Sequence, residues 1–323
     1  MESSSDLIDA IEICCLIEAT ARKPGNVHPC AAFDDLSYDD FVQAASASAK
    51  PLANSRSGSL GMAILQAVEA TQSVTRSNVN LGIALLIAPL ACVPADSPLE
   101  SGIGVILART SIQDAADTFA AILAAKPGGL GKTTSQDVHD QPTVTLREAM
   151  VLAADRDRIA QQYATDFAGL LGRDRRWLVE EWTSAHEQVG RLNSNWRCDD
   201  PVFSECLTAW EVAVIRFQMR LLATTPDSLV VRKCGQAIAV ELQHRAVAVA
   251  ESDWPGEPSG WSLLLQFDQW LRADGHRRNP GTTADFVAAA LFAAVRDDLI
   301  QIPSREEVVQ HAARIQQFPG KTV

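Results

Sequence analysis

Apolar residues recur every three or four positions along nearly the whole chain, and this spacing limits the folds that the chain can adopt. One stripe runs through Leu7, Ile8, Ile11, Cys15 and Ala19, positions that share one face of an α-helix. The alternation of apolar and polar residues that marks a half-buried strand is almost absent. The sequence therefore predicts an all-α protein, a single bundle of about ten to twelve helices.

The expected helix starts carry local signals. Ser111, Thr145 and Ser304 are each followed three positions later by an acidic residue, which is the spacing of a capping box. Proline and glycine gather only in short loops, too short to separate domains, so residues 1–323 are expected to form one domain. The predicted helices cover residues 5–21, 38–49, 57–74, 79–92, 111–125, 144–171, 174–192, 200–223, 228–250, 260–274, 283–299 and 304–316.

The charge balance and hydropathy exclude two kinds of partner. Lys and Arg number 28 against 40 Asp and Glu, a formal net charge of −12. This is the wrong sign for a protein that tracks a phosphate backbone, so no nucleic-acid partner is expected. The most apolar stretch, residues 81–93, is well short of the roughly 20 residues that cross a bilayer. It is expected to form a buried helix, and no membrane partner is predicted.

Cysteine usage indicates the compartment. The seven cysteines form no CxxC pair and are odd in number, which suits reduced thiols. The first residues contain no basic region followed by an apolar core, so they do not resemble a secretory signal. We therefore expect a cytoplasmic protein.

Four polar stretches between apolar helices are the places where a bundle would carry chemistry. The first runs from Glu18 through the sequence RKPGNVH, residues 22–28, to Asp34 and Asp35. Lys23 lies beside a Pro-Gly turn, where its ammonium would suit a phosphate, and Asp35 would suit a metal or a developing positive charge. A solvated turn is the plainer interpretation of so short a motif.

The second and third stretches begin helices. NVNLG, residues 78–82, opens the most apolar helix; Asn78 is a good N-cap, and free amides at a helix start suit an anion or a sugar hydroxyl. The third, residues 227–235, has a cap carboxylate followed by Arg232 and Lys233. That pattern is also common on exposed helices.

The fourth stretch is NPGTTAD, residues 279–285, which follows Arg277 and Arg278. Thr282 and Asp285 have capping-box spacing, and the turn, the hydroxyls and the helix start together would make an anion site. Motifs of zinc proteases, hydrolase elbows, nucleotide-binding P-loops and dinucleotide folds are absent. The six histidines show no metal-ligand spacing.

Taken in order, the four stretches resemble the ATP:dephospho-CoA triphosphoribosyltransferase family over nearly the whole chain. The family's glutamate and PKPGLVD loop are matched by Glu18 and RKPGNVH, and the aspartate of its HKDM run falls on Asp35. Its NTHKG helix start corresponds to residues 78–82, its DTN-to-Arg-Gly segment to residues 227–235, and its PGGSADL to PGTTADF at residues 280–286.

The chain departs from the lyase-associated bacterial members at a few positions. His28 replaces an acid, Asp34 replaces a lysine, and Asn80 and Leu81 replace a His-Lys pair. The sequences PGNVH, NxNLG and NPGTTAD are closer to an archaeal-like branch. These departures bear on the acceptor substrate more than on the reaction type.

The resemblance implies an enzyme that breaks the N-glycosidic bond of ATP, releases adenine and joins the triphosphoribosyl group to 3'-dephospho-CoA. Such a bond breaks through an oxocarbenium-like state, which needs a carboxylate near the sugar, a base and cations for the phosphates. We expect Mg²⁺ on Asp35 and Asp227, and Glu18 or Asp285 as the base; Glu18, Asp35 and Asp285 are thus the catalytic candidates. The substrate-binding candidates are Lys23, Gly25, Asn26, His28, Asn78, Asn80, Arg232, Lys233, Asn279, Gly281, Thr282 and Thr283.

Two other functions stay open at this point. One is a related ribosyl-phosphate transfer to another acceptor in cofactor biosynthesis, such as a pterin or other C1 carrier. The other is a non-catalytic helical nucleotide-binding protein. Adenine release measured against a panel of acceptors distinguishes all three, and the sequence does not indicate an oligomeric state.

Overall fold

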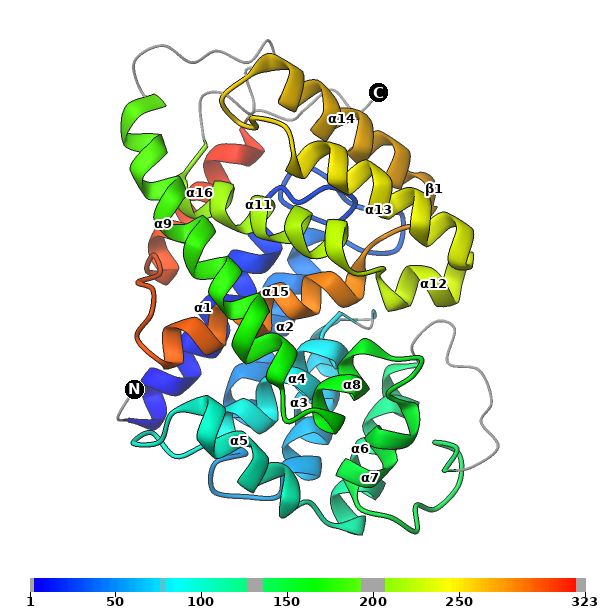
Figure 1. Cartoon of the computed structure of the whole chain (residues 1–323). Helices are drawn as coiled ribbons and strands as arrows, with labels where there is room; N and C mark the ends of the chain where they lie inside the picture. Colours follow the sequence, from blue (N-terminus) through cyan, green and yellow to red (C-terminus); the bar gives the residue numbers. More distant parts are fainter. Residues whose placement is uncertain (1–2, 76, 78, 127–135, 193–206, 318–323) are drawn as a thin grey trace. The chain divides into compact units, whose positions relative to one another are not determined.

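A computed structural model of the chain describes residues 3–75, 77, 79–126, 136–192 and 207–317. The described part contains 15 α-helices, one π-helical segment and one four-residue extended segment (Figure 1). The prediction of an all-α protein is confirmed, with a somewhat larger number of helices than expected. None of these helices has the length and apolarity that a bilayer crossing would require.

The helices follow one another with short connections. Their bounds are α1 Ser4–Thr20, α2 Tyr38–Asn54, α3 Leu60–Val74, α4 Leu81–Cys92, α5 Leu99–Ala108, α6 Ile112–Ala125, α7 Leu146–Ala153, α8 Arg158–Ala164, η1 Gly169–Asp174 (the π-helix), α9 Arg175–Leu192, α11 Ala209–Thr224, α12 Ser228–Cys234, α13 Gln236–Ala250, α14 Pro258–Arg272, α15 Gly281–Arg296 and α16 Arg305–Gln316, with the extended segment β1 at Ala273–His276.

Two predicted long helices are broken, and each break has a local cause. In the predicted helix 144–171, Asp157 accepts hydrogen bonds from the backbone N–H groups of Ile159 (2.8 Å) and Ala160 (3.1 Å), so it starts α8 instead of continuing α7. In the predicted helix 228–250, Gly235 has a φ of +83°, which separates α12 from α13. Helix α5 was not predicted at all.

The predicted capping boxes at Ser111, Thr145 and Ser304 are confirmed. The first of them does more than cap α6. Asp114 accepts from the N–H and hydroxyl of Ser111 through Oδ2, and from the hydroxyl of Ser59 and the N–H of Gly61 through Oδ1, at 2.7–2.9 Å. A single carboxylate therefore joins the starts of α3 and α6.

The contacts divide the chain into two compact units. The first unit comprises Met1–Cys15, Asp39–Arg175 and Ala288–Leu299. Its core contains α4, which is buried over almost its whole length, as predicted for the most apolar stretch. Helices α3 and α6 pack on each other and on α4, and the Tyr163 hydroxyl donates to the Leu85 carbonyl at 2.6 Å.

The second unit comprises Leu16–Tyr38, Arg176–Val287 and Ile300–Val323. Within it α11 packs on α13, and α13 packs on α12 and α14 (Figure 1). Helix α11 is buried on most of its surface and supports the loop that follows α1. The prediction of one domain over residues 1–323 stays a prediction.

Candidate functional site

The RKPGNVH loop is anchored in the second unit by a buried ion pair. The guanidinium of Arg22 donates two hydrogen bonds to the carboxylate of Glu211 on α11, from Nε to Oε1 (2.6 Å) and from Nη2 to Oε2 (2.8 Å). The backbone N–H of Arg22 also donates to Oε1 at 3.1 Å. His311 of α16 contacts Oε2 through Nε2 at 3.0 Å. Both side chains of the Arg22–Glu211 pair are 0% exposed. Burial alone would raise the pKa of Glu211, but Arg22 and His311 outweigh it and hold the pKa well below its ordinary value of 4.5.

Lys23 is paired with Glu18, the residue at the other end of the same turn. Its Nζ lies 2.9 Å from Glu18 Oε1, and it also contacts the Glu18 carbonyl oxygen. The Lys23 side chain is 0% exposed. The predicted phosphate ligand and one of the two predicted bases therefore form one buried pair in this structure.

Gly25 is required by both its conformation and its surroundings. Its φ is +75°, a region that side-chain-bearing residues rarely adopt. A Cβ at this position would lie 2.7 Å from Leu271 Cδ1. The N–H of Gly25 donates to Asp268 Oδ1 of α14 at 2.7 Å. The loop thus follows α14 at a distance that only glycine permits.

Replacing Gly25 with alanine is expected to cost about 2–4 kcal/mol of folding free energy, from left-handed strain and from the collision with Leu271. Gly235→Ala is the matched control, because Gly235 also has a positive φ but has no atom within 4 Å of the added Cβ. Denaturant unfolding of both variants gives the comparison. Equal losses in the two would contradict the close approach at Gly25.

A chain of side-chain amides crosses the loop at Asn26. Gln218 Nε2 of α11 donates to Asn26 Oδ1 at 2.6 Å, and Asn26 Nδ2 donates to Asn279 Oδ1 at 2.7 Å. Arg272 of α14 donates to the Asn26 carbonyl. Asn26 thereby joins the first polar stretch to the fourth.

His28 is held as a neutral side chain. Burial, assisted by the charges of Arg272, Arg22 and Lys23 and opposed by Glu211, lowers the pKa of His28 well below its ordinary value of 6.5. Its Nδ1 accepts a hydrogen bond from the N–H of Cys30 at 3.3 Å, which leaves the proton on Nε2. His28 can donate one hydrogen bond to a ligand but offers it no positive charge at neutral pH.

Asp227 joins the third stretch to the fourth. Its Oδ1 accepts from the N–H groups of Leu229 (2.9 Å) and Val230 (3.0 Å) at the start of α12. Its Oδ2 accepts from the N–H (2.7 Å) and hydroxyl (2.8 Å) of Thr283 in the first turn of α15. Thr282, predicted to cap α15, is already inside the helix and its hydroxyl contacts that of Ser228 at 3.2 Å. The start of α15, predicted to bind an anion from a ligand, binds the carboxylate of Asp227 instead.

Asp35 of the first stretch lies close enough to Lys233 of the third stretch for its charge to act on the lysine. Lys233, half-buried on α12, has a pKa lowered from 10.5 mainly by burial and also by Arg232, while Cys234, Asp227 and Asp35 act in the opposite direction. Asp35 lies 3.0 Å from Nδ1 of His276, measured from its Oδ1. Arg232 is exposed and Asp285 is half-buried.

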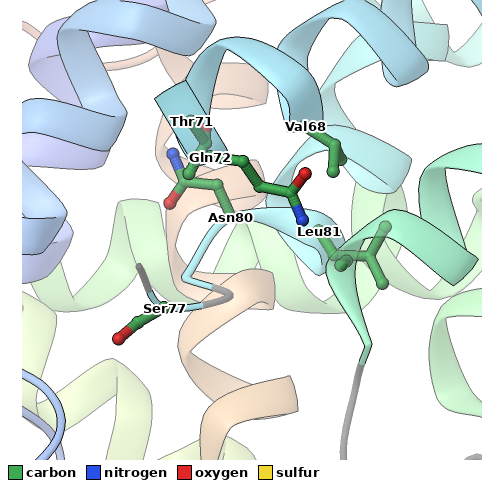
Figure 2. A pocket seen from close by; sticks show the side chains of 7 residues that line it. Val68, Thr71, Gln72, Ser77, Asn80 and Leu81 are labelled. Carbon is green, nitrogen blue, oxygen red and sulfur yellow. The ribbon is translucent and has the colours of Figure 1, made fainter. Parts of the chain in front are cut away.

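Three of the four predicted stretches therefore meet within the second unit, whereas the second stretch lies in the first unit. Asn78 is outside the described residues. The N-cap position of α4 is held by Asn80, whose side chain makes no cap hydrogen bond and instead donates to Ser48 Oγ at 3.1 Å. Figure 2 shows the pocket beside Asn80, with Thr71, Gln72 and Leu81 around it. Its volume of about 10 Å³ is room for about one water molecule, too little for an adenine or a ribose.

The predicted Mg²⁺ ligands can be tested against these contacts. All four acceptor positions of Asp227 are used by N–H and hydroxyl groups of the protein, and the residue is 0% exposed. Asp227 therefore does not fit a Mg²⁺ ligand. The described residues contain no group of three or more His, Cys, Asp or Glu side chains that would hold a metal. A Mg²⁺ ion bound largely by phosphates needs only one or two carboxylates, so Asp35 as a ligand stays a prediction.

Sequence reasoning missed the residues that anchor the loop, because all of them except His276, which lies in β1, occupy ordinary positions on helices. An acid in the first turn of α11 looks like a helix-dipole partner, and nothing nearby in sequence marks it as buried. The missed residues are Glu211, Gln218, Asp268, Arg272, His276 and His311.

A model of the family described as CitG, ATP:dephospho-CoA triphosphoribosyl transferase, matches residues 4–189 and 179–304. Among solved structures, the chain is similar to one from Archaeoglobus fulgidus with the provisional description triphosphoribosyl-dephospho-CoA synthase. The two share 20% identity and a TM-score of 0.56 over 80% of this chain and 99% of that chain. A search of curated proteins gave no match.

Proposed function

The chain belongs to the ATP:dephospho-CoA triphosphoribosyl transferase family, and we propose that the three polar stretches in its second unit bind the nucleotide that it uses. The family's enzymes transfer the triphosphoribosyl group of ATP to dephospho-CoA. One observation carries the proposal. Within a single unit, Asn26–Asn279 joins the first stretch to the fourth, and Asp227–Thr283 joins the third stretch to the fourth.

The triphosphate needs positive charge that a ligand can reach. Arg22 and Lys23 are fully buried and paired with acids, whereas Arg232 is exposed and Lys233 is half-buried on the short helix α12. We therefore assign the phosphates to Arg232 and Lys233. Lys23 contributes by holding Glu18 and the loop in place, and it contacts phosphate only if that pair opens.

The two candidate bases differ in their surroundings. Glu18 is buried and its carboxylate is bound to the ammonium of Lys23. Asp285 is half-buried near the start of α15, close in sequence to the segment that Asn26 and Asp227 hold. Because Asp285 is the less deeply buried of the two, we propose it as the group that takes the proton of the acceptor hydroxyl, a role that requires it to come within hydrogen-bond reach of that hydroxyl.

The charge of Lys233 makes nucleotide binding sensitive to alkaline pH. Because its pKa is lowered from 10.5, Lys233 loses its proton at a lower pH than an exposed lysine does. The dissociation constant of ATP is expected to rise as pH passes through this pKa. In Lys233→Arg the rise should move to higher pH, since arginine stays protonated. Calorimetric titration between pH 7 and 10 measures it, and identical profiles for the two proteins would exclude Lys233 from the phosphate contact.

The reaction itself is tested by product analysis. The purified protein is incubated with ATP, Mg²⁺ and dephospho-CoA, and in parallel with other hydroxyl-bearing acceptors, including a pterin. We expect free adenine and an equal amount of triphosphate-bearing product with dephospho-CoA. Adenine formed only with another acceptor would reassign the acceptor, and ATP binding without adenine under any condition would contradict the transferase.

A further inference from the structure

The N-termini of α12 and α15 are fastened to each other at three adjacent points. The Asp227 carboxylate spans the two helix starts, and the hydroxyls of Ser228 and Thr282 meet at 3.2 Å. Leu229 packs so closely on Gly281 that a Cβ there would lie 2.9 Å from Leu229 Cδ2. Asp227, Thr282 and Thr283 are buried. We call this set of contacts the double cap.

The far end of α12 is also fastened. Arg277 Nη2 donates to the Lys233 carbonyl at 3.2 Å, and the Cys234 thiol donates to the Arg277 carbonyl at 3.3 Å. Helix α12 has only seven residues, a length at which a helix does not hold its own conformation in water. Its direction therefore depends on these two sets of contacts, both of which lead to the segment 277–283.

We propose that Asp227 is a positioning residue of the transferase, and not a metal ligand. Its carboxylate sets the direction of α12, which carries Arg232 and Lys233, relative to the start of α15, which carries Asp285. The two cations that would bind the triphosphate, Arg232 and Lys233, are thereby held at a fixed position relative to Asp285, the acid proposed to act near the sugar. The inference rests on the proposed function for the roles of those three side chains, but the double cap itself is independent of them.

Two variants weaken the Asp227–Thr283 contact of the double cap, one from each side. Asp227→Asn keeps one oxygen, but its new amide N–H₂ must face either the α12 amides or the Thr283 N–H, so a buried donor loses its acceptor. Thr283→Val keeps the Thr283 N–H and removes only the hydroxyl, while Thr283→Ser retains both donors and serves as the conservative rescue. A displacement of about 1 Å between reacting groups can cost on the order of 100-fold in rate. We expect kcat for adenine release to fall by about that factor in Asp227→Asn, to fall less in Thr283→Val, and to recover in Thr283→Ser.

The first unit supplies a matched control. Asp114 also joins the starts of two helices, α3 and α6, by accepting hydrogen bonds from two N–H groups and two hydroxyls, but it belongs to none of the proposed binding stretches. Asp114→Asn should lower the melting temperature as Asp227→Asn does and leave kcat close to that of the unmodified protein. This comparison separates a general loss of stability from a loss of positioning.

The metal alternative makes opposite predictions. If Asp227 held Mg²⁺, Asp227→Asn would raise the Mg²⁺ concentration that gives half-maximal rate, excess Mg²⁺ would restore activity, and Thr283→Val would have no effect. The positioning role predicts an unchanged Mg²⁺ dependence. It also predicts that the Asp227→Asn/Thr283→Val double variant is no worse than Asp227→Asn alone, since both changes act on one contact.

These experiments distinguish failure of the positioning role of Asp227 from failure of the proposed transferase function. If the unmodified protein releases no adenine, the function fails, while the double cap is still measured by the non-additive loss of melting temperature in the double variant. If the unmodified protein is active, full kcat in Asp227→Asn, or its recovery at high Mg²⁺, overturns the positioning role.

Discussion

Replacing Glu211 with alanine is expected to destabilise the second unit by about 3–5 kcal/mol, because it removes the buried carboxylate that binds the buried Arg22 guanidinium. Both side chains are 0% exposed, so water does not take over the lost contacts. Chemical denaturation followed by far-UV circular dichroism measures the change. The exposed pair Arg245–Glu241 on α13 provides the control, and Glu241→Gln should stay within about 0.5 kcal/mol of the unmodified protein.

The same ion pair adds a pH dependence to stability. Because Glu211 has a folded-state pKa below its ordinary 4.5, its contribution is present above that pH and is lost as the pH falls through the lower, folded-state value. In Arg22→Met/Glu211→Leu, an apolar pair replaces the ions, and much of the loss should be recovered. An alanine variant within about 1 kcal/mol of the unmodified protein would show that the pair does not anchor the loop.

Lys23→Ala is expected to abolish adenine release while leaving the helical content unchanged. The substitution removes the ammonium that holds Glu18 at the base of the RKPGNVH loop, and misplaced loop groups lose on the order of 100-fold or more in rate. Since Lys23 is buried and bound to Glu18, we expect the loss mainly in kcat, with a smaller increase in the KM for ATP. Steady-state adenine release and circular dichroism measure the two quantities.

Lys50→Ala is the control for this substitution, because Lys50 is an exposed lysine of α2 outside the proposed stretches. Its activity should match that of the unmodified protein. Full activity in Lys23→Ala would remove Lys23 from the mechanism, and a large KM change with normal kcat would instead make it a direct phosphate ligand.

The helical fold was predictable because its signals are local. The apolar stripe of α1 and the capping boxes at Ser111, Thr145 and Ser304 each lie within a few residues of the structure that they specify. The breaks at Asp157 and Gly235 also had local signals, a cap residue and a glycine. They were missed because apolar periodicity continues across both positions and outweighs a single residue.

The site was predictable only in part, because its decisive contacts join distant segments. Arg22 and Glu211 are separated by 189 positions, and no pattern in the sequence of α11 pairs them. The start of α15 shows the same limit. Thr282 and Asp285 have the spacing of a capping box, yet the buried acceptor for Thr283 comes from Asp227, 56 positions earlier. The motifs located the polar stretches, whereas their partners depended on tertiary packing.

The proposed nucleotide site is formed by the stretches around residues 22–35, 227–235 and 279–285. A crystal structure of the protein with a non-reactive ATP analogue tests it most directly. We expect the triphosphate against Arg232 and Lys233 and the ribose near Asp285. An analogue that binds away from all three stretches would contradict the claim.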